Sequence, residues 1–119
     1  MADEITIVTA LKVTNGDLRE NKPTITKKFN QTTARAGSFT VNVGTTEESI
    51  AFGDIAPGFV ELRNLDATNY VSFGTVTGNL GFRLLAGSGS GLVYLESGET
   101  LYVQANTAAC NVQVTAASV

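Results

Sequence analysis

The chain has 119 residues, the size of one ordinary domain, of which 43% are hydrophobic and 16% are charged. This composition is too apolar for a disordered tail, and the net charge of −3 argues against a general nucleic-acid binder. No apolar run approaches the ~20 residues that a membrane span needs, so we expect no membrane partner.

Residues 1–38 are the least regular part of the sequence. Apolar side chains alternate with more polar ones over residues 5–13, which predicts an early strand that Thr9 interrupts on its apolar side. The Asn-Gly-Asp sequence at residues 15–17 is typical of a tight hairpin, because these residue types tolerate a positive φ. Residues 15–37 are polar overall and predict a long surface loop or an extended arm.

Basic side chains concentrate in this N-terminal region. Residues 1–35 carry six basic side chains against four acidic ones, whereas residues 36–119 carry two against seven. Two interpretations stay open: ordinary surface variation, or a basic segment that meets an acidic surface on a neighbouring copy or partner. The candidate partner-contact residues are Lys22, Lys27, Lys28, Phe29, Arg35 and Arg63.

Residues 39–119 alternate with the period of two that a half-buried strand requires. The alternating apolar residues fall in four runs: Phe39, Val41 and Val43; Val60 and Leu62; Leu101, Val103 and Ala105; and Val112 and Val114. No stretch has sustained helical periodicity. We therefore predict an all-β fold, an antiparallel β-sandwich or jelly-roll-like barrel. The chain is one domain overall, with residues 1–38 as a partly extended N-terminal strand or arm and residues 39–119 as the β core.

Residues 59–74 combine a strand, a polar corner and a second strand. Asn64, Asp66 and Asn69 can each bond back to nearby backbone and so fix a corner without a helix. We interpret these three residues as a structural corner, and the alternative is a ligand or ion held by the Asn/Asp cluster. Arg63 precedes them on the polar face, where it can pair with Glu61 or with another subunit.

The sequence offers few catalytic groups. It has no histidine, which removes Ser-His-Asp and Cys-His catalysis and the commonest metal ligand. Cys110 has no second cysteine to pair with and is expected to be a small buried hydrophobic side chain. The glycine-rich run at residues 86–91 lacks the Gly-Lys-Ser/Thr of a phosphate loop. We therefore expect no enzyme activity, no cofactor and no metal site.

Four segments of the chain resemble a pattern common in small virion proteins of tailed bacteriophages. They read Val-Gly-Thr-Thr-Glu-Glu at residues 43–48, Leu-Arg-Asn-Leu-Asp-Ala-Thr-Asn-Tyr-Val-Ser-Phe-Gly at 62–74, Phe-Arg-Leu-Leu-Ala-Gly at 82–87 and Leu-Tyr-Val-Gln-Ala-Asn-Thr-Ala at 101–108. The resemblance covers about residues 39–117 and carries over no catalytic residue. It implies a structural role in the phage particle.

Within that resemblance, the leading expectation is a capsid decoration or cement protein that binds the outer capsid surface and stabilises the head. Its expected partners are the major capsid protein or other virion proteins and further copies of itself, as a dimer or trimer. Its expected location is the capsid surface of the virion, after synthesis in the host cytoplasm, because the first residues lack the basic stretch of a signal peptide. The alternatives are a tail or head–tail connector protein and a fibre-like carbohydrate- or receptor-binding module.

Overall fold

The computed structural model describes residues 4–119 and divides the chain into two compact units. We call Met1–Thr33 the arm and Ala34–Val119 the body. The division falls after residue 33 rather than after residue 38, because the strand that opens the body already begins at Ala36. All strand pairs are antiparallel and no helix occurs in residues 4–119, which confirms the all-β prediction.

The arm is a two-stranded hairpin of β1 (Ile5–Asn15) and β2 (Leu18–Phe29). Asn15 pairs with Leu18, so the turn has two residues, and Gly16 takes a φ of 58° that favours glycine there. The turn lies where the sequence predicts one. The stretch after it, for which we expected a loop or an extended arm, forms a long strand, because β1 supplies partners for its backbone groups.

A bulge interrupts the hairpin near its middle. Thr9 pairs with Ile25 and Leu11 pairs with Lys22, so two residues of β2, Pro23 and Thr24, lie opposite one residue of β1. Proline has no N–H to donate to the ladder and is tolerated where the pairing is already broken. The bulge therefore allows Pro23 to lie inside a strand of twelve residues.

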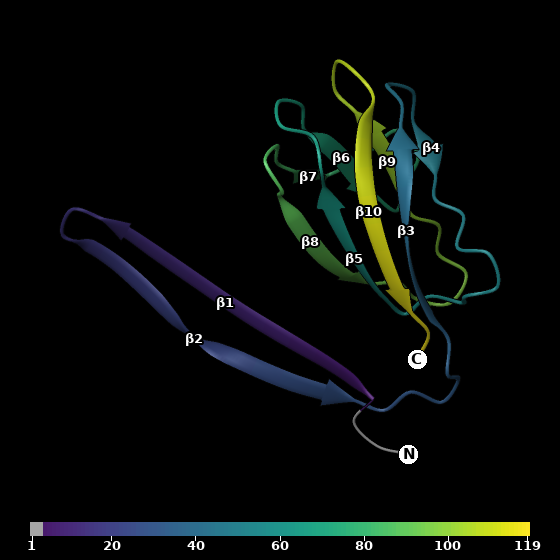
Figure 1. The fold of residues 1–119 in the computed structure, drawn as a ribbon, viewed down its shortest axis with the longest axis horizontal. Helices are drawn as coiled ribbons and strands as arrows, with labels where there is room; N and C mark the ends of the chain where they lie inside the picture. Colours follow the sequence, from purple (N-terminus) through teal and green to yellow (C-terminus); the bar gives the residue numbers. More distant parts are fainter. Residues whose placement is uncertain (1–3) are drawn as a thin grey trace. The chain divides into compact units, whose positions relative to one another are not determined.

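The body consists of two four-stranded sheets, drawn in Figure 1. One sheet has the order β3-β10-β5-β8 and the other the order β4-β9-β6-β7. The strands are β3 (Ala36–Val43), β4 (Glu48–Ser49), β5 (Phe59–Asn64), β6 (Val71–Gly74), β7 (Phe82–Leu84), β8 (Ser90–Tyr94), β9 (Tyr102–Ala105) and β10 (Cys110–Ala117). Every chain connection except β6–β7 passes from one sheet to the other, which makes the body an eight-stranded jelly roll.

The hydrophobic core lies between the two sheets of the body. Alternate residues of each strand point inward, as the period-two pattern predicts: Leu62 of β5 and its partner Val114 of β10 are both fully buried. The opposite sheet contributes Val71, Val103 and other apolar side chains to the same cluster. The outward residues of β3 and β10 are polar and bond across the strands, Ser38 to Thr115 among them at 3.1 Å.

Candidate functional site

The polar corner between β5 and β6 is built around Asn64, whose side chain is fully buried. Its Nδ2 donates to the carbonyl oxygens of Asn69 at 2.8 Å and Leu84 at 3.2 Å. Its Oδ1 accepts from the backbone N–H of Asp66 at 3.0 Å. A buried polar side chain must find such partners, and here they tie the corner to the end of β7.

Asp66 caps the next turn of the corner. Its Oδ2 accepts from the backbone N–H groups of Asn69 at 2.6 Å and Thr68 at 3.0 Å, and from the Thr68 hydroxyl at 3.2 Å. The bond from the Asn69 N–H, followed by the bonds from Thr68, lowers the pKa of the Asp66 carboxyl below its ordinary value of 3.8. The corner is therefore held by an ionised carboxylate at neutral pH.

Two further loops are bonded to the same corner. Gly87 in the β7–β8 loop donates its N–H to the carbonyl of Asp66 at 2.8 Å, and Ser88 donates to the carbonyl of Asn64 at 3.1 Å. In the β9–β10 loop, the Thr107 hydroxyl donates to Oδ1 of Asn69 at 2.6 Å. The sequence places Asn64, Asp66 and Asn69 in a corner, and the structure shows that this corner joins three loops at one end of the jelly roll.

The chemistry of the corner is that of a structural joint. Oδ1 of Asn64, Oδ2 of Asp66 and Oδ1 of Asn69 each accept hydrogen bonds from within the body. Over residues 4–119, no group of three or more His, Cys, Asp or Glu side chains is arranged to hold a metal ion. The hydrogen bonds that Asn64, Asp66 and Asn69 make between loops explain why these polar residues occupy the corner.

Cys110 begins β10 next to this corner. Its side chain is buried in the core cluster, and Sγ lies 3.4 Å from the carbonyl oxygen of Ala108. Burial, and then the nearby Asp66 carboxylate, raise the pKa of the Cys110 thiol. Because the thiolate is the reactive form, both burial and the raised pKa disfavour reaction at Cys110, whose side chain packs in the core.

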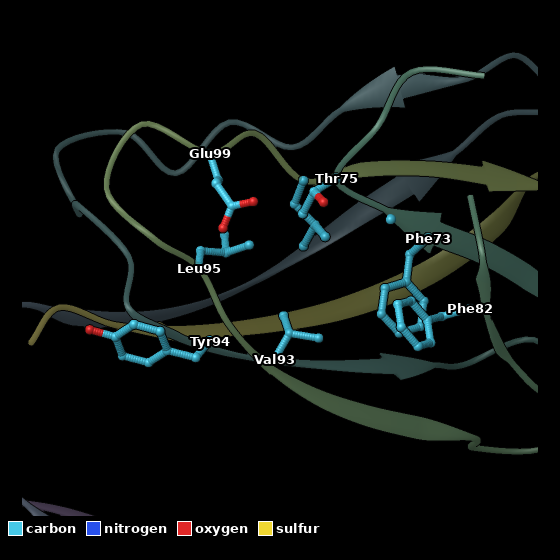
Figure 2. A pocket seen from close by; sticks show the side chains of 9 residues that line it. Phe73, Thr75, Phe82, Val93, Tyr94, Leu95 and Glu99 are labelled. Atoms are coloured by element: carbon cyan, nitrogen blue, oxygen red, sulfur yellow. The ribbon is translucent and has the colours of Figure 1, made fainter. Parts of the chain in front are cut away.

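A cavity of about 210 Å³ opens between the sheets beside β8. Figure 2 shows Phe73 and Phe82 together at one end of it and Tyr94 at the other. The two phenyl rings stack with centroids 5.4 Å apart. Apart from Glu99, Thr75 and Tyr94 with its hydroxyl, the lining residues are apolar. A second hollow, also of about 210 Å³, shares Tyr94 and Leu95 with the first and is lined as well by Pro57 and Val119.

Exposed apolar side chains lie on β7 and β8 and directly after β7. We call this surface the β7–β8 edge and define it by Phe82 (63% exposed), Leu85 (65%), Leu92 (42%) and Tyr94 (50%). Three carboxylates accompany it: Glu61 pairs with Leu92 across β5 and β8, and Glu96 and Glu99 form the turn after β8. Sequence reasoning missed this edge, because its residues belong to separate strands whose order is decided only by the fold.

The candidate contact residues of the arm lie on β2. Lys22 has its ammonium 4.0 Å from the carboxylate of Glu20, and both side chains are mostly exposed. Lys27 and Lys28 are adjacent in the strand and so point to opposite faces of the hairpin. Phe29, at the end of β2, is 39% exposed. These four residues lie in one element of the fold.

The other two candidate contact residues belong to the body. Arg35 donates to the carboxylate of Asp54 at 2.8 Å, and its carbonyl accepts from the backbone and hydroxyl of Ser118. These contacts fasten the start of β3 to the chain end. Arg63 is exposed on the outer face of β5, opposite Ser90 of β8. The structure therefore separates the six candidates into an arm group and a body group.

Comparison with known proteins gives no family. No family model and no curated protein matches the sequence. Over the residues described, no helix is long and apolar enough to cross a membrane. One solved structure, from work on Bacillus endospore appendages as a novel family of disulfide-linked pili, aligns with 73% of this chain and 88% of its own. Its sequence identity is 14% and its TM-score is 0.38.

Proposed function

We propose that the chain is a structural component of a bacteriophage particle, namely a capsid decoration protein that binds the outer capsid surface and stabilises the head. The observation that carries the proposal is the jelly-roll strand order β3-β10-β5-β8 over β4-β9-β6-β7. Jelly rolls recur in viral capsid proteins, in lectins and in cupins. A shared fold does not determine a function, so the side chains must distinguish among these three classes.

The side chains favour the capsid class. A cupin-like metal site would use histidine, the commonest metal ligand, and the sequence has none. A jelly-roll enzyme would need ionisable groups that converge in a pocket, whereas the cavity beside β8 has a single carboxylate, Glu99, in its lining. The polar corner has a role in the fold, because its hydrogen bonds join loops of the body.

A β-sandwich body with an arm also suits a protein that stabilises a lattice. Each copy would contribute a modest contact to the capsid and to its neighbours, and many copies would act together through avidity. The body offers an exposed apolar edge, and the arm offers basic side chains. A capsid decoration protein needs such contact surfaces and does not need a catalytic site.

Deletion of the gene for this chain tests the proposal. We expect particles that still assemble but lose infectivity at lower temperature or under osmotic shock, and we expect the purified protein to bind the deleted particles and restore their resistance. Mass spectrometry of purified wild-type particles checks that the chain is present. Particles that lack the chain in the wild type, or that withstand heat and shock equally well without it, would sink the proposal.

A carbohydrate- or receptor-binding module is the second candidate, and one observation favours it. Phe82 is 63% exposed and Tyr94 is 50% exposed, and both line a largely apolar cavity. Exposed aromatic side chains at a cavity suit the binding of a sugar ring. Binding to a glycan array that is lost in Tyr94→Ala would support this candidate. An array without hits would remove it.

A further inference from the structure

The strand register gives the arm two unlike faces. Residues paired across β1 and β2 lie on the same face, and side chains alternate along each strand. One face therefore collects almost all of the large apolar side chains of the hairpin. We call it the apolar face; its apolar members are Ile5, Ile7, Leu11, Val13, Leu18, Ile25 and Phe29, and it also carries Lys22, Lys27 and Glu20.

The opposite face is polar and basic. It carries Thr, Asn, Lys and Arg side chains, and its one large apolar side chain is Val8. Lys12, Arg19 and Lys28 all lie on it, without an acidic residue among the paired positions. The hairpin therefore resembles a strand pair in which one face packs against another layer of the protein.

Most of the apolar face is nonetheless exposed within the chain. Leu11 is 62% exposed, Leu18 58%, Ile25 50% and Val13 40%. A two-stranded hairpin alone is marginally stable in water, and exposed apolar patches of more than a few hundred Å² usually mark an interface. With a strand rise of about 3.4 Å and strands about 4.8 Å apart, this face covers on the order of 400 Å². A partner surface that covered it would stabilise the hairpin.

Charge indicates what that partner is. All four lysines of the sequence lie in the arm, which carries five basic residues against four acidic ones, whereas the body carries three against seven. The body of a second copy therefore complements the arm electrostatically, and two arms facing each other would not. Within the body, the β7–β8 edge combines exposed apolar side chains with the carboxylates of Glu61, Glu96 and Glu99, and it also carries Arg83 on β7, which stacks on Tyr70, and Arg63 opposite Ser90.

We propose that the apolar face of the arm binds the β7–β8 edge of a second copy of this chain. The inference deepens the proposed function, and rests on it, by naming the contact through which copies associate. Two copies exchanging arms would bury about 800 Å² on each partner, the size of a standard stable interface.

A matched pair of variants tests the face. Val13→Asp places a charge on the apolar face, and Val8→Asp makes the same change on the opposite face. Light scattering across a dilution series should show an oligomer for the wild type and for Val8→Asp, and an association at least about tenfold weaker for Val13→Asp. A monomeric wild type, or equal weakening by both variants, overturns the inference. Unchanged thermal melting of the body in Val13→Asp separates lost association from lost folding.

Zero-length cross-linking of the wild-type protein tests the contact without any variant. A carbodiimide joins lysines to carboxylates, and every lysine side chain lies in the arm. In a mixture of light and heavy isotope-labelled protein, we expect arm lysines joined to Glu61, Glu96 or Glu99 in mixed-isotope pairs. Links found only within one copy, or only between arms, overturn the inference. Particle stabilisation by a protein that stays monomeric would leave the proposed function standing, so the two failures are distinguishable.

Discussion

The arm and the body use the same sequence pattern with opposite results. In the body, alternate apolar residues such as Leu62, Val103 and Val112 are at most 1% exposed. In the arm, alternate apolar residues such as Leu11 and Ile25 are half exposed or more. The body has two sheets whose apolar faces cover each other, whereas the arm has one two-stranded sheet and no second layer of its own.

This difference separates two meanings of alternation. A period of two establishes that a strand has an apolar face, and it says nothing about which surface covers that face. In the body the cover comes from the same chain, and the stability of the unit follows from its core. In the arm the same pattern becomes a binding surface, and its stability depends on what it binds.

The largest difference between the two units should appear in core truncations. Leu62→Ala removes a fully buried side chain and should lower the free energy of unfolding of the body by about 3 kcal/mol. The same change at Leu11, which is 62% exposed, should alter the unfolding of the body by less than about 0.5 kcal/mol. Urea denaturation followed by circular dichroism measures both. Equal losses would show that arm and body share one core.

The second-largest loss of stability should come from a change in the polar corner. Asn64→Ala leaves the carbonyls of Asn69 and Leu84 without the donor they have now, and should cost about 2–3 kcal/mol of unfolding free energy. Asn42→Ala is the control, since Asn42 bonds to Asn111 on the exposed face of its sheet and should cost less than about 1 kcal/mol. The same denaturation experiment applies, and an Asn64 variant as stable as the control contradicts the structural role of the corner.

The tight loop beside the corner should show a somewhat smaller effect. A Cβ at Gly89 would lie 2.3 Å from the carbonyl oxygen of Leu85, so Gly89→Ala should destabilise the body by about 2 kcal/mol. A Cβ at Gly81 would have no atom within 4 Å, and Gly81→Ala should leave the melting temperature nearly unchanged. Similar melting curves for the two variants would mean that the loop moves freely.

The smallest effect should be a loss of stability of the body at acid pH. Hydrogen bonds from Asn69 and Thr68 lower the pKa of Asp66 below 3.8, so the stability they provide is present above that pH and is lost as the pH falls through the lowered value. Asp66→Asn should be less stable than the wild type at neutral pH, and the gap should narrow below about pH 4. Melting temperatures from about pH 7 to about pH 2 measure the gap, and a gap independent of pH would contradict this origin.

Particular residues show how far the sequence reaches. The alternation at Val60–Leu62 and Val112–Val114 predicts strands and their buried faces, and the structure confirms both. The Asn-Gly-Asp turn predicts the hairpin tip at the right residues. The pairing of Leu18–Phe29 with β1 was not predicted, because the polar composition hides a pattern that becomes visible only when each residue is placed beside its partner on β1.

The corner and the β7–β8 edge both show which contacts cannot be predicted from local sequence. A turn can be predicted at Asn64, Asp66 and Asn69, because side chains of these types form hydrogen bonds with backbone groups a few residues away. That Asn64 also holds Leu84, twenty residues away, depends on the strand order of the jelly roll.

The sequence by itself determined an all-β chain, its hairpin turn, its inward-facing residues and a basic N-terminal region, because these depend on local geometry and on the period of a strand. The tertiary structure decided which strands are neighbours, and with them the apolar and acidic β7–β8 edge and the two unlike faces of the arm. Strand neighbours are chosen by contacts between residues far apart in the chain, and no local pattern records that choice.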